Sequence, residues 1–212
     1  MRVCLVEDGD GPRGPVRGDV CGGIPRTYIF HMRPFGIMII ALSGTPGVGK
    51  SAVSSILSTR DRGVVEISKL IQEKGLTGDY DADRDTYEVD LDLLDREVMG
   101  MGSEDDVIIE GHLSHLLSVG LIVVLRCSPS LLGQRLRSRG WSESKIMENM
   151  EAEACDVILI EALDSGVEVC ELDTTFLTPE EVADALEEII QGEREKYAPG
   201  NIDWSEEVLD WF

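Results

Sequence analysis

The chain is poor in lysine and in aromatic side chains, and it has no long apolar run. Only 5% of its 212 residues are aromatic. The chain has 41 acidic residues but only five lysines and 14 arginines. The net charge of −22 repels nucleic-acid backbones and anionic lipid, which excludes general nucleic-acid coating and binding to a membrane surface. No apolar stretch reaches the roughly 18 residues of a spanning helix, and no secretory signal pattern is visible. We therefore expect a cytoplasmic protein without a membrane partner.

The few cysteines form no pattern that would hold a metal or a disulfide framework. No CxxC spacing occurs among them, and no histidine stands at metal-ligand spacing from them. We therefore predict reduced thiols, with neither a zinc site nor structural disulfides. The five are Cys4, Cys21, Cys127, Cys155 and Cys170.

Residues 1–37 have no periodic apolar face and are rich in glycine and proline. Five arginines and four acidic residues give this segment a net charge of +1, so the rest of the chain carries −23. Such a composition is typical of disorder, and we predict a disordered extension or a misassigned start, with Met32 or Met38 as the true first residue. A functional basic arm is the alternative.

From Met38 onward, short apolar runs alternate with helical patterns, which indicates an α/β fold with a parallel sheet covered on both faces. Two polar stretches, 77–90 and 128–141, interrupt the alternation after strands, where such sheets place ligand sites. The predicted strands are 38–43, 63–67, 107–109, 121–125 and 167–172, and the predicted helices are 52–59, 69–73, 91–98, 130–139, 142–163 and 179–190.

The first strand runs into GTPGVGKS at 44–51, which matches G-x-x-x-x-G-K-[ST] at every fixed position. Glycines let the backbone curve so that its N–H groups point at one phosphate, and the following helix adds its positive N-terminal dipole. We expect Lys50 to reach the outer phosphates of a nucleotide and Ser51 to ligate Mg²⁺. The apolar strand before the motif and the helical pattern after it favour this interpretation over a simple glycine-rich turn.

The run VIIEGH at 107–112 supplies a second group of candidate residues. Glu110 ends a buried strand beside the phosphate loop, where these folds hold the Mg²⁺ shell directly or through water. His112, two residues later, is a candidate for orienting or deprotonating a water or acceptor group. A structural role for His112 is the alternative, and we interpret His115 as a packing residue.

Arginine forms the third group. Arg126 ends the fourth predicted strand, and the next helix carries Arg135, Arg137 and Arg139. Phosphoryl transfer spreads negative charge over the equatorial oxygens, so cationic donors that close around it stabilise the transition state. The alternative is a solvated helix whose arginines pair with nearby glutamates such as Glu143.

Together, GTPGVGKS, EGH at 110–112, VVLRCSP at 123–129 and LRSRGWSESKIMENMEAEACDVILIEAL at 136–163 resemble the adenylate kinase isoenzyme 6 family. The resemblance implies a P-loop nucleoside monophosphate kinase fold, with a five-stranded parallel sheet of order 2-3-1-4-5 and helices on both faces. It implies a kinase domain at 38–195 that contains an acceptor-binding insertion at about 64–98 and a lid at about 127–145. An acidic-aromatic tail at 196–212 follows, either as a docking helix or as a partner-facing appendage.

The resemblance also implies an activity: Mg²⁺-ATP-dependent phosphorylation of AMP to give two ADP, together with an ATPase activity. Glu110 stands where the family usually has Asp, and its longer arm favours a water-mediated metal contact. Arg84 is the candidate for the AMP phosphate. The implied catalytic residues are Lys50, His112, Arg126, Arg135 and Arg139; the implied ATP-binding residues are Gly44, Pro46, Gly47, Val48, Gly49, Lys50, Ser51, Ala52 and Arg126; the implied metal ligands are Ser51 and Glu110.

A role in maturation of the small ribosomal subunit, through a basic protein of that subunit and the pre-ribosomal particle, is a further implication of the resemblance. Residues 163–212 hold 15 acidic residues against Arg194 and Lys196, a net charge of −13 that suits a basic partner. Adaptation to high salt is another explanation of the acidity. Two other functions stay open: a kinase of another acceptor, of the dephospho-coenzyme A or shikimate type, and an ATPase that acts chiefly in assembly.

Overall fold

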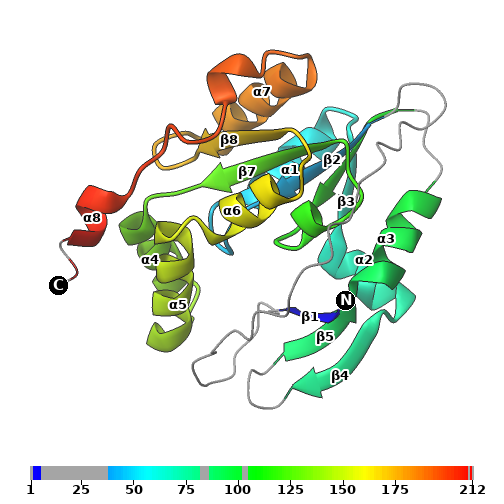
Figure 1. Cartoon of the computed structure of the whole chain (residues 1–212), viewed down its shortest axis with the longest axis horizontal. Coiled ribbons are helices and arrows are strands. Elements are labelled where there is room, and N and C mark those ends of the chain that lie inside the picture. The colour runs from blue at the N-terminus through cyan, green and yellow to red at the C-terminus, as the bar shows by residue number, and fades with distance from the viewer. Residues whose placement is uncertain (1, 6–37, 82–85, 102–104, 210, 212) are drawn as a thin grey trace.

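The computed structural model describes residues 2–5, 38–81, 86–101, 105–209 and 211, and its centre is a five-stranded parallel sheet (Figure 1). The strand order is β3-β6-β2-β7-β8, which is 2-3-1-4-5 when these strands are counted along the chain. The predicted fold class and strand order are therefore confirmed. The strands are β2 (Ile39–Ser43), β3 (Gly63–Glu66), β6 (Val107–Glu110), β7 (Leu121–Arg126) and β8 (Val169–Asp173).

Helices join these strands, and several of them begin at a side chain that caps the first turn. The side chains of Ser128 and Ser142 accept hydrogen bonds from backbone N–H groups in the first turns of α4 and α5. Thr178 and Glu181 form a capping box at the start of α7. The helices are α1 (Lys50–Thr59), α2 (Ile67–Lys74), α3 (Leu91–Gly100), α4 (Pro129–Ser138), α5 (Glu143–Ala154), α6 (Val157–Asp164), α7 (Pro179–Ile190) and α8 (Ser205–Leu209), with short 3-10 turns η1 (Ser114–Leu116) and η2 (Glu195–Tyr197).

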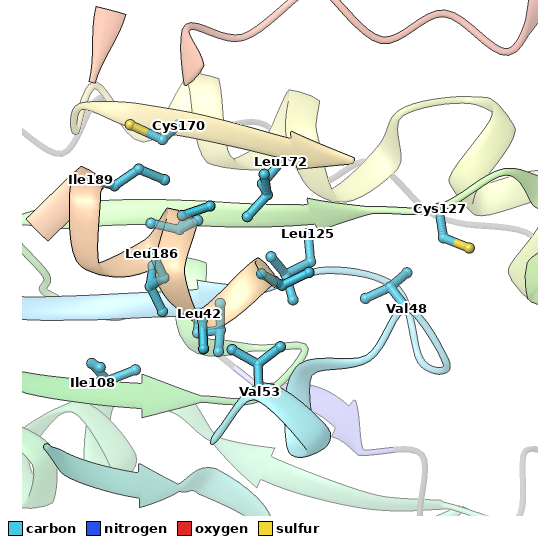
Figure 2. Packing of buried hydrophobic residues seen from close by; sticks show 14 of the residues in the cluster. Leu42, Val48, Val53, Ile108, Leu125, Cys127, Cys170, Leu172, Leu186 and Ile189 are labelled. Carbon is cyan, nitrogen blue, oxygen red and sulfur yellow. The ribbon is translucent and has the colours of Figure 1, made fainter. Parts of the chain in front are cut away.

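Alternate residues of β2 face opposite sides of the sheet, and both sides are buried. Ile40 and Leu42 pack in one apolar cluster with α1 and α7, part of which Figure 2 shows. Ile39 packs with α2 and α3, and Ala41 packs beneath α6. Burial on both faces explains why the strand reads as a continuous apolar run.

The predicted helix at 142–163 is wrong in one respect, because the structure divides it into α5 and α6 (Figure 1). Asp156, at the break, has a φ of 56°, a left-handed conformation that aspartate tolerates better than most residues. Its carboxylate pairs with the buried guanidinium of Arg126. The break turns α6 away from the axis of α5 and onto the sheet, and this tertiary pairing has no counterpart in the helical periodicity.

The polar stretch at 77–90 contains an antiparallel hairpin, formed by β4 (Thr77–Asp81) and β5 (Thr86–Asp90). A further strand, β1 (Arg2–Leu5), pairs with β5 and completes a small sheet of order β1-β5-β4. The structure thus has a strand at residues 2–5, within the segment expected to be a disordered extension or a misassigned start, and the edge of β5 supplies its hydrogen bonds. Residues 6–37 lie outside the described part of the chain.

The C-terminal tail contacts the domain at two points. The Gly200 backbone N–H donates to Glu171 Oε2 at 2.8 Å. Glu207 of α8 accepts hydrogen bonds at the start of α4, from Ser128 Oγ at 2.8 Å and from the Ser130 N–H at 2.5 Å. The described part of the tail thus lies against the domain, and its role toward a partner stays a prediction. Within the described ranges, no helix is long and apolar enough to span a membrane.

Candidate functional site

The loop between β2 and α1 requires glycine at defined places. Gly44, Gly47 and Gly49 have φ values of 137°, 98° and 117°, which side-chain-bearing residues rarely adopt. A Cβ on Gly44 would lie 2.4 Å from the Leu125 carbonyl oxygen, and one on Gly47 would lie 2.7 Å from Leu132 Cδ1. The loop therefore curls tightly against β7 and α4, with the N-terminus of α1 following it.

Lys50, the first residue of α1, lies inside this loop with only 8% of its surface exposed. Its Nζ donates hydrogen bonds to the carbonyl oxygens of Gly44, at 2.7 Å, and Thr45, at 3.2 Å. These contacts hold the ammonium group within the loop that would surround a phosphate.

The loop forms one wall of a cavity of about 390 Å³ at the carboxyl ends of the strands. The opposite wall comes from α2 and the hairpin, and the ends of β3 and β6 lie between the two walls. The lining residues are Pro46, Gly47, Gly49, Lys50, Ser51, Ala52, Glu66, Ile67, Ser68, Ile71, Gln72, Thr77, Tyr87, Glu110, Gly111, His112 and Arg139.

Two carboxylates stand side by side at the edge of the sheet. Glu110 ends β6 and is 6% exposed, and Glu66, which ends β3, is its partner in the strand register. Both line the cavity, as does the exposed Ser51 of the loop. Oxygen groups of this kind fit Mg²⁺, which usually completes its shell with water and substrate phosphates. The described residues contain no cluster of three or more histidine, cysteine or acidic side chains that would enclose a metal by itself.

His112 lies at the same end of the cavity in a neutral form. Burial, together with the charges of Lys50 and His115, lowers its pKa from 6.5 to about 4. Its Nε2 is buried and finds no hydrogen-bond partner among the described residues. A neutral imidazole nitrogen without a partner beside a ligand cavity can accept a proton from a bound group.

His115 has the packing role expected of it. It is 2% exposed, its Nδ1 lies 2.9 Å from Ser43 Oγ, and its Nε2 lies 3.0 Å from Glu161 Oε2.

The arginines of α4 and its C-terminal end separate into three roles. Arg139 lines the cavity. Arg135 donates instead to the Val48 carbonyl at 3.2 Å and to the Thr174 carbonyl at 3.3 Å, so it supports the phosphate loop from behind. Arg137 pairs with Glu143 on the surface, which is the arrangement predicted for a solvated helix whose arginines pair with nearby glutamates.

Arg126 lies in the interior, which does not fit the expected contact with nucleotide. Only 1% of its surface is exposed, and its guanidinium is held by Glu153, Asp156 and Glu171. Burial lowers the pKa of Arg126, but the three carboxylates outweigh it and raise that pKa above its usual range. The guanidinium of Arg126 thus bonds to groups of the fold and does not line the cavity, and its expected contact with nucleotide stays a prediction.

Other predicted residues also lie away from the cavity surface. Val48 is fully buried, and its side chain belongs to the apolar cluster in Figure 2. Gly44 is not among the residues that line the cavity, and its carbonyl accepts a hydrogen bond from Lys50 Nζ. Arg84, the candidate for an acceptor phosphate, falls outside the described residues, so its role stays a prediction.

The cavity also contains residues that the sequence analysis did not identify. Glu66 is the clearest of them, since it ends a strand beside Glu110 and the same argument would have found it. Gln72 and Tyr87 come from α2 and the hairpin, and nothing in the local pattern shows that these segments face the phosphate loop.

Comparisons with known proteins agree with this geometry. A family model described as "AAA domain" matches residues 40–156. A protein of Archaeoglobus fulgidus named "Putative adenylate kinase" is 45% identical over 176 residues, which cover 82% of this chain and 95% of the relative. A protein of the same name from Thermococcus onnurineus is 42% identical over 171 residues, 80% of this chain and 93% of the relative.

Among solved structures, "Shikimate kinase from Acinetobacter baumannii in complex with shikimate" aligns with a TM-score of 0.53 and covers 75% of this chain and 96% of that one. Its identity of 15% makes this a likeness of fold alone. The sequence matches span nearly the whole length of the relatives, and the family expected from the motifs is confirmed. The chain belongs to the AAA-domain family and to the family of the archaeal relatives named "Putative adenylate kinase".

Proposed function

We propose that this chain is an ATP-dependent nucleoside monophosphate kinase that converts ATP and AMP into two ADP and also hydrolyses ATP. One observation carries the proposal: a single cavity joins a complete phosphate loop, with Lys50 and Ser51, to a second wall made by α2 and the β4–β5 hairpin. Phosphoryl transfer needs such a site, because the donor and the acceptor phosphates must meet in line within a space that holds both.

In the proposed reaction, an oxygen of the AMP phosphate attacks the γ-phosphorus of ATP, and the bond from that phosphorus to the β–γ bridging oxygen breaks, so that ADP leaves. Lys50 and Arg139, the cationic residues that line the described cavity, would stabilise the charge on the transferred group. Ser51 and Glu110 would hold Mg²⁺, directly or through water. When bound, the metal ion neutralises charge on the β- and γ-phosphates.

Hydrolysis places a different demand on the site. The AMP phosphate attacks with an oxygen that is already ionised at neutral pH, since the second pKa of such a phosphate is about 6. An attacking water must lose a proton, and we propose that the neutral His112, which lines the cavity, receives it.

The test is product analysis with a panel of acceptors. ATP is incubated with AMP, other nucleoside monophosphates, dephospho-coenzyme A or shikimate, and the products are separated. We expect ADP to form from AMP, and we expect K50A to abolish transfer while its circular dichroism and melting temperature stay close to wild type. Phosphorylation of shikimate or dephospho-coenzyme A alone would overturn the proposal in favour of another small-molecule kinase.

We also propose that the protein acts in small-subunit maturation by holding a basic ribosomal protein. Two surface features support this: the net charge of −13 in residues 163–212, and an apolar stripe on α6 in which Val157, Ile160 and Leu163 are 39%, 51% and 47% exposed. Acidic residues of the same helix, Glu161 and Asp164, adjoin the stripe.

A pull-down from cell extract at physiological salt tests the partner. We expect recovery of a basic small-subunit protein, and we expect I160S to reduce it without changing ATP turnover, since Ile160 lies on the outer face of α6. Recovery of no ribosomal protein would count against the role in maturation and would leave the kinase proposal standing.

A further inference from the structure

A buried carboxylate outside the cavity contacts the phosphate loop directly. Glu153, on α5, is 2% exposed and is not among the residues that line the cavity. Its Oε2 accepts a hydrogen bond from Thr45 Oγ1 at 2.5 Å. Its Oε1 accepts from Arg126 Nε at 2.7 Å and from the Cys127 N–H at 3.1 Å. Both oxygens are thus engaged, one by the loop and one by the end of β7.

Thr45 is the residue through which this carboxylate can act on the loop. The side chain of Thr45 is held by Glu153, while its carbonyl accepts from Lys50 Nζ at 3.2 Å and from the Val48 N–H at 3.3 Å. A displacement of Thr45 would therefore move two contacts that shape the loop. Three glycines make this loop flexible in principle, and a buried, charge-assisted hydrogen bond is a strong restraint on it.

The same contact connects the loop to the segment that carries Arg139. Arg139 follows α4, and α5 begins at Glu143, packs on α4 and reaches Glu153 one residue before its end. Helix α5 therefore extends from Glu143, shortly after the cavity residue Arg139, to Glu153, which contacts the phosphate loop.

We propose that Glu153 is a positioning residue for the phosphate loop and acts through the hydroxyl of Thr45. It holds the loop in the shape that receives the donor phosphates, so that ATP binds without first ordering the backbone. This inference rests on the proposed function, since it concerns the affinity of the same loop for ATP.

The test replaces the hydroxyl and leaves the ion pair between Glu153 and Arg126 in place. T45V has the shape of threonine without the donor, and T45S retains the donor. We expect T45V to raise the KM and the dissociation constant for ATP about tenfold, the size of one lost hydrogen bond to a charged group, while the KM for AMP stays within twofold. T45S should restore the affinity for ATP.

S118A is a matched control, because it removes a similar hydrogen bond from a hydroxyl to a carboxylate at the other end of the sheet. Ser118, which precedes β7, donates its hydroxyl to Asp95 Oδ2 at 2.8 Å. S118A should leave both nucleotide affinities unchanged. If T45V does not fold, T45A takes its place, because alanine removes the same donor and has no methyl groups on Cβ to accommodate.

Three outcomes would overturn the inference: unchanged ATP affinity in T45V, equal losses for ATP and AMP, or the same loss in T45S as in T45V. A wild-type protein that binds no ATP would contradict the proposed function itself, which is a separate result.

Discussion

Arg126 Nε and Glu153 Oε1 lie 2.7 Å apart in the interior, between the end of β7 and helix α5. Glu171 of β8 holds the other side of the guanidinium, with Nη1 and Oε1 2.5 Å apart. The arginine thus joins the sheet to the helix behind the phosphate loop. Because an unpaired buried charge is costly, each member of this group depends on the others.

We expect R126M to destabilise the protein by about 3–5 kcal/mol, because it leaves buried carboxylates without their partner. Chemical denaturation with measurement of the free energy of unfolding checks this. R137M is the matched control: it breaks an exposed pair with Glu143 and should lower the free energy of unfolding far less than R126M does. An R126M protein of normal stability that had lost its affinity for ATP would place Arg126 at the nucleotide site.

His112 should matter more for hydrolysis than for transfer to AMP. We expect H112N to lower the ATPase rate about 100-fold and the rate of AMP phosphorylation less than tenfold, since only the attacking water has a proton to lose. The ATP dissociation constant should change little. Parallel losses in ATP binding and in both rates would mean that His112 is structural.

His112, which is half-buried with its Nε2 enclosed, also predicts a pH-dependent stability. Its folded pKa of about 4 lies below the unfolded value of 6.5, so the unfolded chain takes up the proton first as the pH falls. Stability is unaffected above pH 6.5 and is lost progressively below it, by at most about 3 kcal/mol at pH 4. Wild type should therefore lose more stability than H112N between pH 7.5 and pH 5, a range above the pI of 4.3. Identical losses in urea denaturation would contradict this.

Two glycines of the phosphate loop should respond differently to alanine. Gly44 and Gly49 both have positive φ, but a Cβ at Gly44 would meet the Leu125 carbonyl at 2.4 Å, whereas one at Gly49 would have nothing within 4 Å. G49A should lower the free energy of unfolding by about 1–2 kcal/mol, because alanine is strained at this positive φ. G44A should lower the free energy of unfolding further and should abolish ATP binding, because the loop or β7 must move to make room for the added Cβ. Melting curves and ATP titrations check both, and equal effects would show that the clash is relieved locally.

The contact between tail and domain predicts a smaller effect. Glu207 accepts two hydrogen bonds at the start of α4, where a negative charge is also favoured by the helix dipole. E207Q should lower stability by about 1 kcal/mol, and E206Q, on the same short helix, should be near neutral. Thermal melts at low and moderate salt measure the difference. Equal values for the two variants would mean that α8 contributes nothing at this end of α4.

Much of this protein could be predicted from local sequence. The apolar run before GTPGVGKS, the helix after it and the repeated strand–helix alternation lead to a parallel sheet, because buried strands and helix caps leave local signatures. Glu110 and His112 could be placed at the cavity for the same reason: they follow a buried strand, and parallel strands end at one edge of the sheet.

Only the tertiary structure decided what the charged groups do. Arg126 ends a strand, as a site residue would, yet three carboxylates from distant segments enclose it, and the same pairing breaks a continuous helical pattern at Asp156. Thr45 and Glu153 meet across 108 residues of sequence, a contact that no periodicity reports. Local patterns record burial and backbone preference, whereas the partner of a buried charge depends on which segments the whole fold brings together.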